Sequence, residues 1–387
     1  MVSYFFSPNY SGSAVQALNL SRHLQRVGLE PFILSANLSG SAPRELVNGV
    51  LVFRVPVNLK MPIATFWWSA ARFLWQHRHH FDLIHAHGTL QHGVVSLMGK
   101  LLRKPTILKV AMAGSDIAFE RQGRVGGAVL RFAVKRFTRY IATADAIAGE
   151  FEFQRLDTGR VRRIPNGVDT EIYAPVSSDT RNELRRTLGL PPGPLVTCVA
   201  IVQERKNIDG ALRIWRSVVE QGGAGHLAII GPVEQPEGPF FRSLQEFVDT
   251  HGLRSRVSFL GSRDPVAPFL KASEVFLFPS KKEGMANAVL EAMACAVPCL
   301  VSKAAGFSSV IRDGVNGLTF DPHDEAAFAT GLLTLLTDES LRARMGNEAR
   351  QRVMEEYSLD TIARRYQDLY EELVPSDRRL PSISGGT

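Results

Sequence analysis

Residues 276–302 read FLFPSKKEGMANAVLEAMACAVPCLVS, and this stretch carries the most specific structural signal in the chain. Its first apolar run predicts a buried strand, the residues after Gly284 predict a helix that runs to Cys295, and PCLVS predicts another strand. A loop that joins a strand end to a helix start directs several backbone N–H groups to one place, where the helix dipole adds positive potential. The stretch therefore predicts a binding site for an anion such as a diphosphate.

Short apolar runs alternate with amphipathic stretches on both sides of this segment. Strands that alternate with helices predict a parallel sheet covered on both faces. The expected strands of the first half are 2–6, 31–36, 82–86, 106–110 and 140–144, with helices at 13–27, 63–79, 90–102 and 126–138. Those of the second half are 195–202, 226–230, 256–260, 275–279 and 298–302.

The strand pattern starts again after Pro165-Asn166-Gly167, and 387 residues suit two domains better than one. We predict an α/β chain of two doubly wound, Rossmann-like domains, 1–165 and 166–357, that face each other across a cleft lined by strand ends. An amphipathic helix at 358–374 is expected to cross back to the first domain, and the tail 375–387 to be disordered. The first strand is short, so either the chain starts inside it or a few upstream residues are missing.

Composition narrows the class of protein. No stretch of 18 apolar residues occurs, no secretory signal opens the chain, and three cysteines in apolar runs are typical of a reducing, cytoplasmic setting. Residues 1–165 carry 21 Lys and Arg against 9 Asp and Glu, whereas 166–387 carry 24 against 29. A basic first half predicts an anionic partner, but no nucleic-acid-binding motif accompanies it. An anionic membrane or a phosphorylated lipid fits better, and a solvated basic surface remains the alternative.

Two glutamates, Glu283 and Glu291, lie within residues 276–302. We place Glu283 in the loop and Glu291 in the helix, so that they reach different ends of an extended ligand. Carboxylates accept hydrogen bonds from sugar hydroxyls. The alternative is a loop glutamate and a surface glutamate with no shared role.

The same segment resembles the donor-binding signature of glycosyltransferase family 4, a retaining family with the GT-B fold. Five further stretches match the family's motifs in sequence order, so the resemblance covers nearly the whole chain. They are Ser11-Gly-Ser13, Ile164-Pro-Asn-Gly-Val-Asp169, Glu204-Arg-Lys-Asn207, Val257-Ser-Phe-Leu-Gly261 and Asp313-Gly-Val-Asn-Gly317.

The resemblance implies roles for individual residues. Glu283 would bind the transferred sugar, Glu291 the ribose hydroxyls, and Lys206 with Arg205 the departing diphosphate. Backbone amides of the donor loop would cradle sugar and phosphate, with Gly12 and Ser13 approaching from the first domain and Gly261 and Arg263 near the base. The donor-loop residues are Gly284, Met285, Ala286, Asn287 and Ala288. The acceptor-side candidates are His87, Lys109 and Asp116. In the alternative interpretation, Lys109 is an ordinary surface residue at the end of a strand.

The implied activity is a metal-independent glycosyltransferase that uses a UDP- or GDP-linked sugar and no cofactor. Charge on a leaving diphosphate can be met by Mg²⁺ or by fixed cations and dipoles. The chain has no Asp-x-Asp metal anchor but does have Lys, Arg, loop amides and a helix start. Histidines gather at 77, 79, 80, 85, 87 and 92; we interpret the first three as a helix end and reject a metal site.

Two departures from the family pattern keep other functions open. Ala200-Ile201 stands where members commonly carry Gly-Arg, and Ala113 where they carry a cleft histidine. A non-catalytic sugar-nucleotide or partner-binding protein and a sugar-nucleotide epimerase are therefore the alternatives. An oxidoreductase is disfavoured, since no Gly-x-Gly-x-x-Gly follows the first strand.

Residues 60–78, KMPIATFWWSAARFLWQHR, and 128–139, AVLRFAVKRFTR, combine aromatic with basic side chains. Such helices suit an anionic membrane interface, and we expect a glycan or lipid-linked acceptor of cell-surface polysaccharide or glycolipid synthesis. In the alternative interpretation, the aromatic side chains, Trp67 and Trp68 among them, pack into the core while the cations face water.

Overall fold

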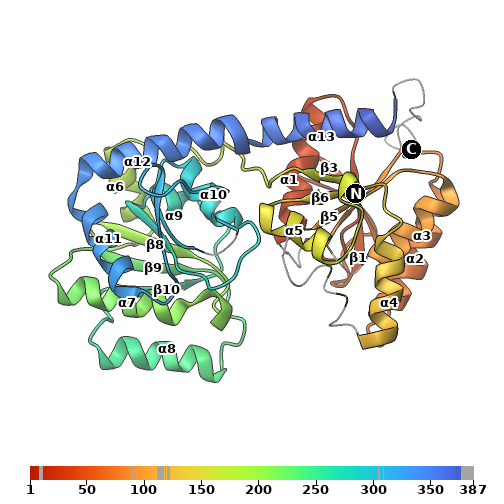
Figure 1. Ribbon diagram of the computed structural model, residues 1–387. Coiled ribbons are helices and arrows are strands. Elements are labelled where there is room, and N and C mark those ends of the chain that lie inside the picture. Colours follow the sequence, from red (N-terminus) through yellow and green to blue (C-terminus); the bar gives the residue numbers. More distant parts are fainter. Residues whose placement is uncertain are drawn as a thin grey trace. The chain divides into compact units, whose positions relative to one another are not determined.

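The computed structural model describes residues 1–7, 12–88, 91–110, 117, 119, 123–303, 306–307 and 309–375. The chain divides into two compact units (Figure 1). Unit 1 comprises Met1–Gly167 together with Leu359–Thr387, and unit 2 comprises Val168–Ser358. Most of the tail for which the sequence predicts disorder, 376–387, lies outside the described residues.

The sheet of unit 1 is parallel except at one edge. The strands are β1(Phe32–Asn37), β2(Arg44–Val47), β3(Val50–Pro56), β4(Ile84–His87), β5(Thr106–Val110), β6(Arg139–Ala142) and β7(Val161–Arg163). They form two runs, β2-β3-β1 and β4-β5-β6-β7, which Val2 joins by bridging to Leu34 and Ala86. The strand expected at 2–6 is therefore wrong in extent: it is reduced to this single bridge.

The antiparallel hairpin β2–β3 is not among the strands expected from the sequence, although its turn has a typical hairpin sequence. Asn48 and Gly49 connect the two strands with φ values of 48° and 82°. A two-residue turn with positive φ at both positions matches the twist of a hairpin, and Asn-Gly is its preferred sequence. The pair lies between apolar residues, so the turn could have been found from the sequence.

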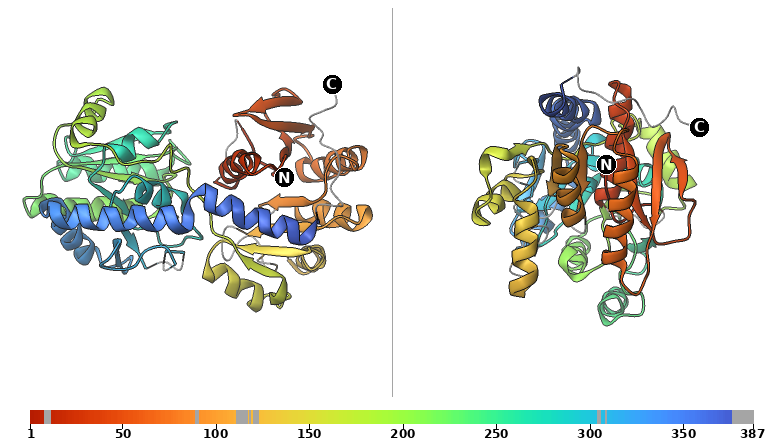
Figure 2. Two further views of the ribbon diagram at one scale, coloured as in Figure 1. Left: turned by 90° about the horizontal axis from the view of Figure 1, so that it is seen from above. Right: turned by 90° about the vertical axis from the view of Figure 1, so that its right-hand side faces the viewer.

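Helices cover both faces of the unit 1 sheet. On one face, α1(Gly12–Arg26) and α13(Leu359–Leu373) pack side by side (Figure 2). On the other, α2(Pro62–Gln76), α3(His92–Leu102) and α4(Gly123–Val134) lie next to one another, and α5(Asp145–Phe153) adds Phe151 to the same core. Within the described part of the chain, no helix combines the length and apolarity needed to cross a membrane.

Unit 2 has one parallel six-stranded sheet in the order β10-β9-β8-β11-β12-β13. Its strands are β8(Leu195–Val199), β9(His226–Ile230), β10(Val257–Gly261), β11(Val275–Phe278), β12(Cys299–Ser302) and β13(Gly317–Phe320). Its helices are α6(Ser178–Thr187), α7(Ile208–Glu220), α8(Pro239–Thr250), α9(Ala267–Lys271), α10(Asn287–Ala294), α11(Glu325–Thr337) and α12(Glu339–Arg352), with short helical turns at η3(Glu204–Lys206) and η4(Val353–Tyr357). Strand order reverses direction between β8 and β11, and ligands of such sheets bind beyond the carboxyl ends of the strands at that point.

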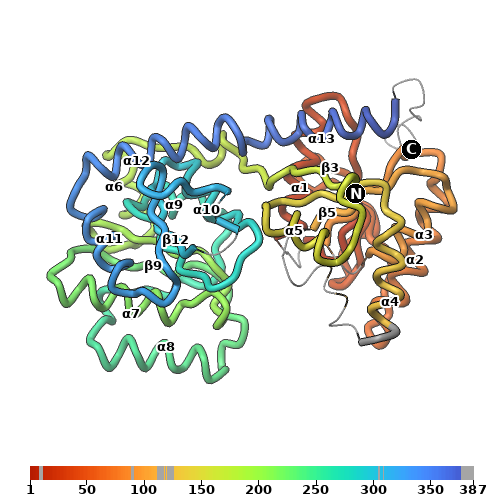
Figure 3. The backbone as a smooth tube through the Cα atoms, viewed as in Figure 1, coloured from red at the N-terminus to blue at the C-terminus, as the bar shows by residue number. Residues whose placement is uncertain are grey.

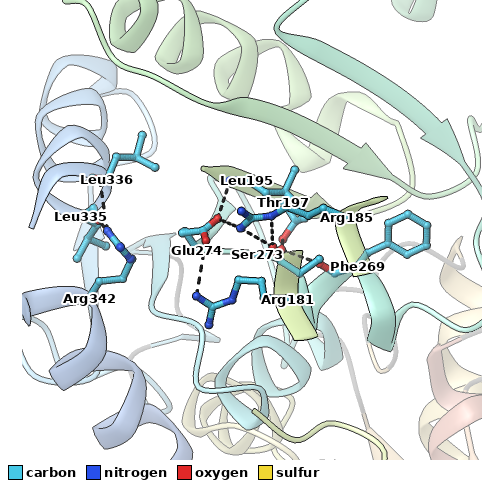
Figure 4. A network of polar contacts seen from close by, with 11 residues as sticks. Arg181, Arg185, Leu195, Thr197, Phe269, Ser273, Glu274, Leu335, Leu336 and Arg342 are labelled. Atoms are coloured by element: carbon cyan, nitrogen blue, oxygen red, sulfur yellow. Dashed lines mark hydrogen bonds and ion pairs between the residues drawn. The ribbon is translucent and has the colours of Figure 1, made fainter. Parts of the chain in front are cut away.

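A buried polar network fastens the opposite, amino-terminal ends of β8 and β11 (Figure 4). The guanidinium of Arg185 on α6 donates to the carbonyl oxygen of Ala272 at 3.0 and 2.8 Å and to the carboxylate of Glu274. The same carboxylate accepts from the amide of Leu195 at 2.6 Å. These contacts tie α6 to both strands and fix where each strand begins.

Candidate active site

The connections after β8 and β11 meet at the carboxyl edge of the unit 2 sheet, because the two strands are direct neighbours. After β8 the chain passes through η3 to Asn207, which has φ 57° and starts α7. The side chain of Asn207 donates to the carbonyl oxygen of Pro279 at 3.0 Å, and the amide of Lys281 donates to that of Arg205 at 3.2 Å. These bonds hold η3 against the loop that follows β11.

Three residues that the sequence singles out come together here. Oε1 of Glu283 accepts from Nζ of Lys206 at 2.5 Å, from Oγ of Ser280 at 2.7 Å and from Nη1 of Arg205 at 3.3 Å. The side chains of Lys206 and Glu283 are 12% and 7% exposed. Lys206 and Glu283 are therefore held together with little access to water at the switch point of the sheet, where Coulomb interactions are strong, and Arg205 joins them from a more exposed position.

The amino end of α10 adds further positive potential to this loop. Its N-cap is Ala286, which has no side chain able to accept from the first amides of the helix. The first amides of a helix point out of its amino end and carry the positive end of the helix dipole, so this end of α10 is suited to an anion. Gly284 to Ala288 form the end of the loop and the first turn, with Met285 buried.

Gly306 fixes the position of this loop and was not singled out from the sequence. A Cβ atom at Gly306 would lie 1.5 Å from the carbonyl oxygen of Gly284 and 3.0 Å from that of Glu283. Only a glycine allows the two backbones to approach so closely. Phe307 packs beside it on Phe278 with ring centroids 5.7 Å apart.

Glu291 lies on α10 and is half-buried. Burial raises the pKa of its carboxyl to about 7, and a hydrogen bond from Tyr173, which lowers it, counters part of that shift. Tyr173 is held in turn by Arg350, which donates to its carbonyl oxygen and to that of Ala294 at 2.7 Å each. Tyr173 and Arg350 are distant from Glu291 in sequence, so no local pattern reveals them.

The loop after β10 contains Asp264, whose charge acts on Tyr173. Burial raises the pKa of Tyr173, and the charges of Glu291 and Asp264 raise it further. Gly261 ends β10 with φ 68°, and its carbonyl oxygen accepts from the amide of Gly231 at 2.9 Å. Arg263 is exposed. Gly261 and Arg263 therefore lie within three residues of Asp264, the residue of this segment whose charge reaches Tyr173.

Known proteins share both the domain pattern and this fold. Residues 10–172 match the model described as Glycosyltransferase Family 4, and 180–352 match Glycosyl transferases group 1. N-acetyl-alpha-D-glucosaminyl L-malate synthase of Bacillus anthracis is 24% identical over 96% of each chain. D-inositol 3-phosphate glycosyltransferase of Xylanimonas cellulosilytica is 28% identical over 93% of this chain and 91% of its own. Anabaena HepE, solved with UDP-glucose, superposes with a TM-score of 0.80 at 20% identity, covering 96% of this chain and all of that one.

This chain is a family 4 glycosyltransferase. Its two units are the Rossmann-like domains of the GT-B fold, as the sequence predicts.

In unit 1 of the glycosyltransferase, Gly12 and Ser13 begin α1. They lie beside the carboxyl end of β4, because a Cβ atom on Gly88 would be 3.7 Å from Oγ of Ser13. Asp116 and Ala113 fall outside the described residues.

His87 and Lys109 are interior residues of unit 1, each at most 4% exposed. They are paired across β4 and β5 on the sheet face that α13 covers, with Nζ of Lys109 5.8 Å from the ring centroid of Tyr366. The alternative of a strand-end surface position for Lys109 is thus wrong. Burial lowers the pKa of Lys109 to about 7.

The histidines of the glycosyltransferase form no candidate metal centre. No group of three or more His, Cys, Asp or Glu side chains suited to a metal ion occurs within the described ranges. His77 directly follows α2, and its Nδ1 lies 2.9 Å from the carbonyl oxygen of Phe73. His85 is bonded through Nδ1 to the Tyr370 hydroxyl at 2.7 Å.

Proposed function

We propose that this glycosyltransferase moves a sugar from a UDP- or GDP-linked donor to an acceptor, with retention of anomeric configuration and without a metal ion. The acceptor is a glycan or lipid-linked intermediate of cell-surface polysaccharide or glycolipid synthesis, on the cytoplasmic face of the membrane. One observation carries the proposal: Lys206 and Arg205 converge on Glu283 beside the amino end of α10. The relatives support it, since Anabaena HepE binds UDP-glucose.

Each of these groups has a task in the proposed transfer. Negative charge grows on the diphosphate as the bond to the sugar breaks, and fixed cations with oriented amides stabilise it without reorganising. Lys206, Arg205 and the amides from Gly284 to Ala288 supply that stabilisation. Glu283 accepts hydrogen bonds from the sugar hydroxyls, and Glu291 accepts them from the ribose.

Chelation tests the metal-independent part. In a thermal-shift screen with EDTA present, a nucleotide sugar should raise the melting temperature in proportion to its concentration over its Kd. Turnover with the same donor should survive EDTA unchanged. Turnover that stops with EDTA and returns with magnesium contradicts metal independence, while leaving donor binding to be judged from the thermal shift.

Gly306→Ala should weaken donor binding about tenfold, the scale of one lost charge-assisted hydrogen bond. The new Cβ must displace the carbonyl group of Gly284, and with it the amides that follow. Isothermal titration with the donor measures the effect. Gly149→Ala is the control, since Gly149 on α5 has open space around its Cβ position and no positive φ. Equal affinities for the two variants would show that the loop tolerates the shift.

Donor affinity should fall as the pH drops below about 7, because protonation removes an acceptor from Glu291. The carboxyl is ionised above its pKa and neutral below it. The loss therefore lies on the acid side and approaches about tenfold per pH unit where only the ionised form binds. A nucleotide sugar is the proper ligand, since it lacks the terminal phosphate that titrates near pH 6 in a free nucleoside diphosphate.

Two variants isolate the carboxyl in that pH profile. Tyr173→Phe removes the hydrogen bond that lowers the pKa of Glu291, so the midpoint should move to higher pH. Glu291→Gln should bind more weakly and with a flat profile. A midpoint that stays in place in Glu291→Gln would assign the titration to another group.

A further inference from the structure

Three neighbouring helices of unit 1, α2, α3 and α4, whose backbones are traced in Figure 3, carry large exposed apolar side chains. Trp68 is 72% exposed on α2, Leu97 62% on α3 and Phe132 62% on α4. We call this the α2–α4 surface, and its apolar members are Trp68, Trp75, Leu97, Leu101, Val129 and Phe132. On each helix the two exposed side chains lie on one stripe, and large exposed apolar side chains gathered on neighbouring helices are typical of a docking surface.

These side chains are not needed for the core of unit 1. The inner face of α2 buries Phe66, Ala70 and Leu74, and Trp67 packs inward beside Gly93. The alternative interpretation, in which both tryptophans pack into the core, therefore holds for Trp67 but is wrong for Trp68. Trp68 lies on the opposite, exposed stripe, so core packing cannot account for it.

Charge on the α2–α4 surface has one sign. The sequences of α2, α3 and α4 contain no Asp or Glu. Exposed cations lie among the apolar side chains: Arg72 between Trp68 and Trp75, Lys100 beside Leu101, and Lys135 after α4. Within the described ranges, the side chains of Lys100 and Lys135 have no hydrogen-bond or ion-pair partner.

A groove of about 620 Å³ lies at the carboxyl ends of α3 and α4, beside the starts of β5 and β6. Five cations line it and no carboxylate does: Lys100, Arg103, Lys104, Lys135 and Arg136. Lys104 already donates to the carbonyl oxygen of Phe81, and Arg136 covers the ring of Phe132 at 3.1 Å. Arg103 and Lys135 remain directed to solvent, with the size and charge to receive phosphate groups.

We propose that the α2–α4 surface docks the chain on an anionic phospholipid membrane. The apolar side chains enter the boundary between headgroups and acyl chains, and the groove cations contact lipid phosphates. A second copy of the chain fits less well, because a two-fold interface on this surface would set the same cations against one another. The proposal is independent of donor chemistry, since membrane binding needs no nucleotide sugar.

Vesicle flotation of the full chain tests the proposed membrane binding. The assay compares binding to vesicles of phosphatidylcholine alone with binding to vesicles of phosphatidylcholine and phosphatidylglycerol. We expect binding to the anionic vesicles only, and its release by high salt. Tryptophan emission should shift to shorter wavelength on binding. The chain has four tryptophans, of which Trp215 is fully buried and Trp67 faces inward, so the shift reports on Trp68 and Trp75.

Two double variants separate the apolar and electrostatic parts. The apolar variant is Trp68→Ser with Phe132→Ser, and the charge variant is Arg103→Glu with Lys135→Glu. Each should lower partitioning into vesicles by about tenfold or more. The apolar variant loses area that enters the membrane, and the charge variant loses two basic residues that each contribute about fivefold near an anionic surface. Leu46→Ser with Phe153→Ser removes apolar side chains that are 70% and 77% exposed elsewhere in unit 1. Arg186→Glu with Arg242→Glu makes the same charge change at exposed positions in unit 2. Both controls should bind vesicles like the parent.

Three outcomes would overturn the proposal. Equal binding to neutral and anionic vesicles would show that the groove cations do not contribute to membrane binding. Equal partitioning of test and control variants would place the contact elsewhere. A dimer in analytical ultracentrifugation that Phe132→Ser dissociates, with no vesicle binding by the parent, would assign the surface to a second copy. Circular dichroism melts confirm that each variant is folded.

Discussion

Replacing Lys206 with alanine should lower turnover by about a hundredfold to a thousandfold, the usual effect of losing one fixed stabiliser of transition-state charge. Nζ of Lys206 lies 2.5 Å from Glu283, and its side chain is only 12% exposed. In that setting, water cannot replace the lost charge cheaply. Because the diphosphate is more negative in the transition state than in the bound donor, kcat should fall more than donor affinity. Steady-state kinetics and donor titration give the two quantities separately.

Lys282→Ala is the matched control for this variant. Lys282 is an exposed lysine in the same loop, next to Glu283, and only its backbone carbonyl takes part in the cluster, as an acceptor from Arg205 at 2.9 Å. It should keep nearly full turnover. If Lys206→Ala and Lys282→Ala have the same turnover number, the charge of Lys206 does not stabilise the transition state. A parent chain that binds the donor yet shows no turnover with any acceptor would instead favour the non-catalytic alternative.

Elements with strong local signals could be predicted from the sequence. Apolar runs located β5(Thr106–Val110) and β9(His226–Ile230), and the helix that contains Glu291 followed from the loop before it. The Asn48-Gly49 turn carries an equally clear local signal for a hairpin. Local periodicity thus accounts for the alternation of strands and helices that defines the fold class, but it did not locate β2, β3 or β13.

The remaining parts of the candidate site depend on contacts between segments far apart in sequence. Gly306 meets Gly284, Arg350 meets Tyr173, and Tyr173 meets Glu291 only after the sheet of unit 2 has formed. Sequence spacing says nothing of such pairs. The orientation of Trp67 and Trp68 is a similar case, because an aromatic pair at adjacent helix positions must point in different directions, and the apolar character of both hides which one faces the core.

Glu274→Ala should lower the free energy of unfolding of unit 2 by about 3–5 kcal/mol, the cost of leaving one partner of a buried ion pair without the other. Arg185 would keep its bonds to Ala272 but lose its counter-charge, and the amide of Leu195 would lose its acceptor. Urea denaturation followed by circular dichroism measures the change, provided that the transition of unit 2 is distinguished from that of unit 1.

Two variants show whether charge pairing is the cause. Arg181 makes a longer contact with the same carboxylate: its Nη1 lies 3.6 Å from Oε1 of Glu274, and its side chain is 29% exposed. Arg181→Ala should therefore lower the free energy of unfolding by less than about 1 kcal/mol. Glu274→Met with Arg185→Met removes both buried charges together and should recover most of the loss. If the double variant is no more stable than Glu274→Ala, the network acts through its geometry. In that case, the amino ends of β8 and β11 need these polar groups to begin where they do, and the loops that carry Lys206 and Glu283 at the other ends should bind the donor more weakly as well.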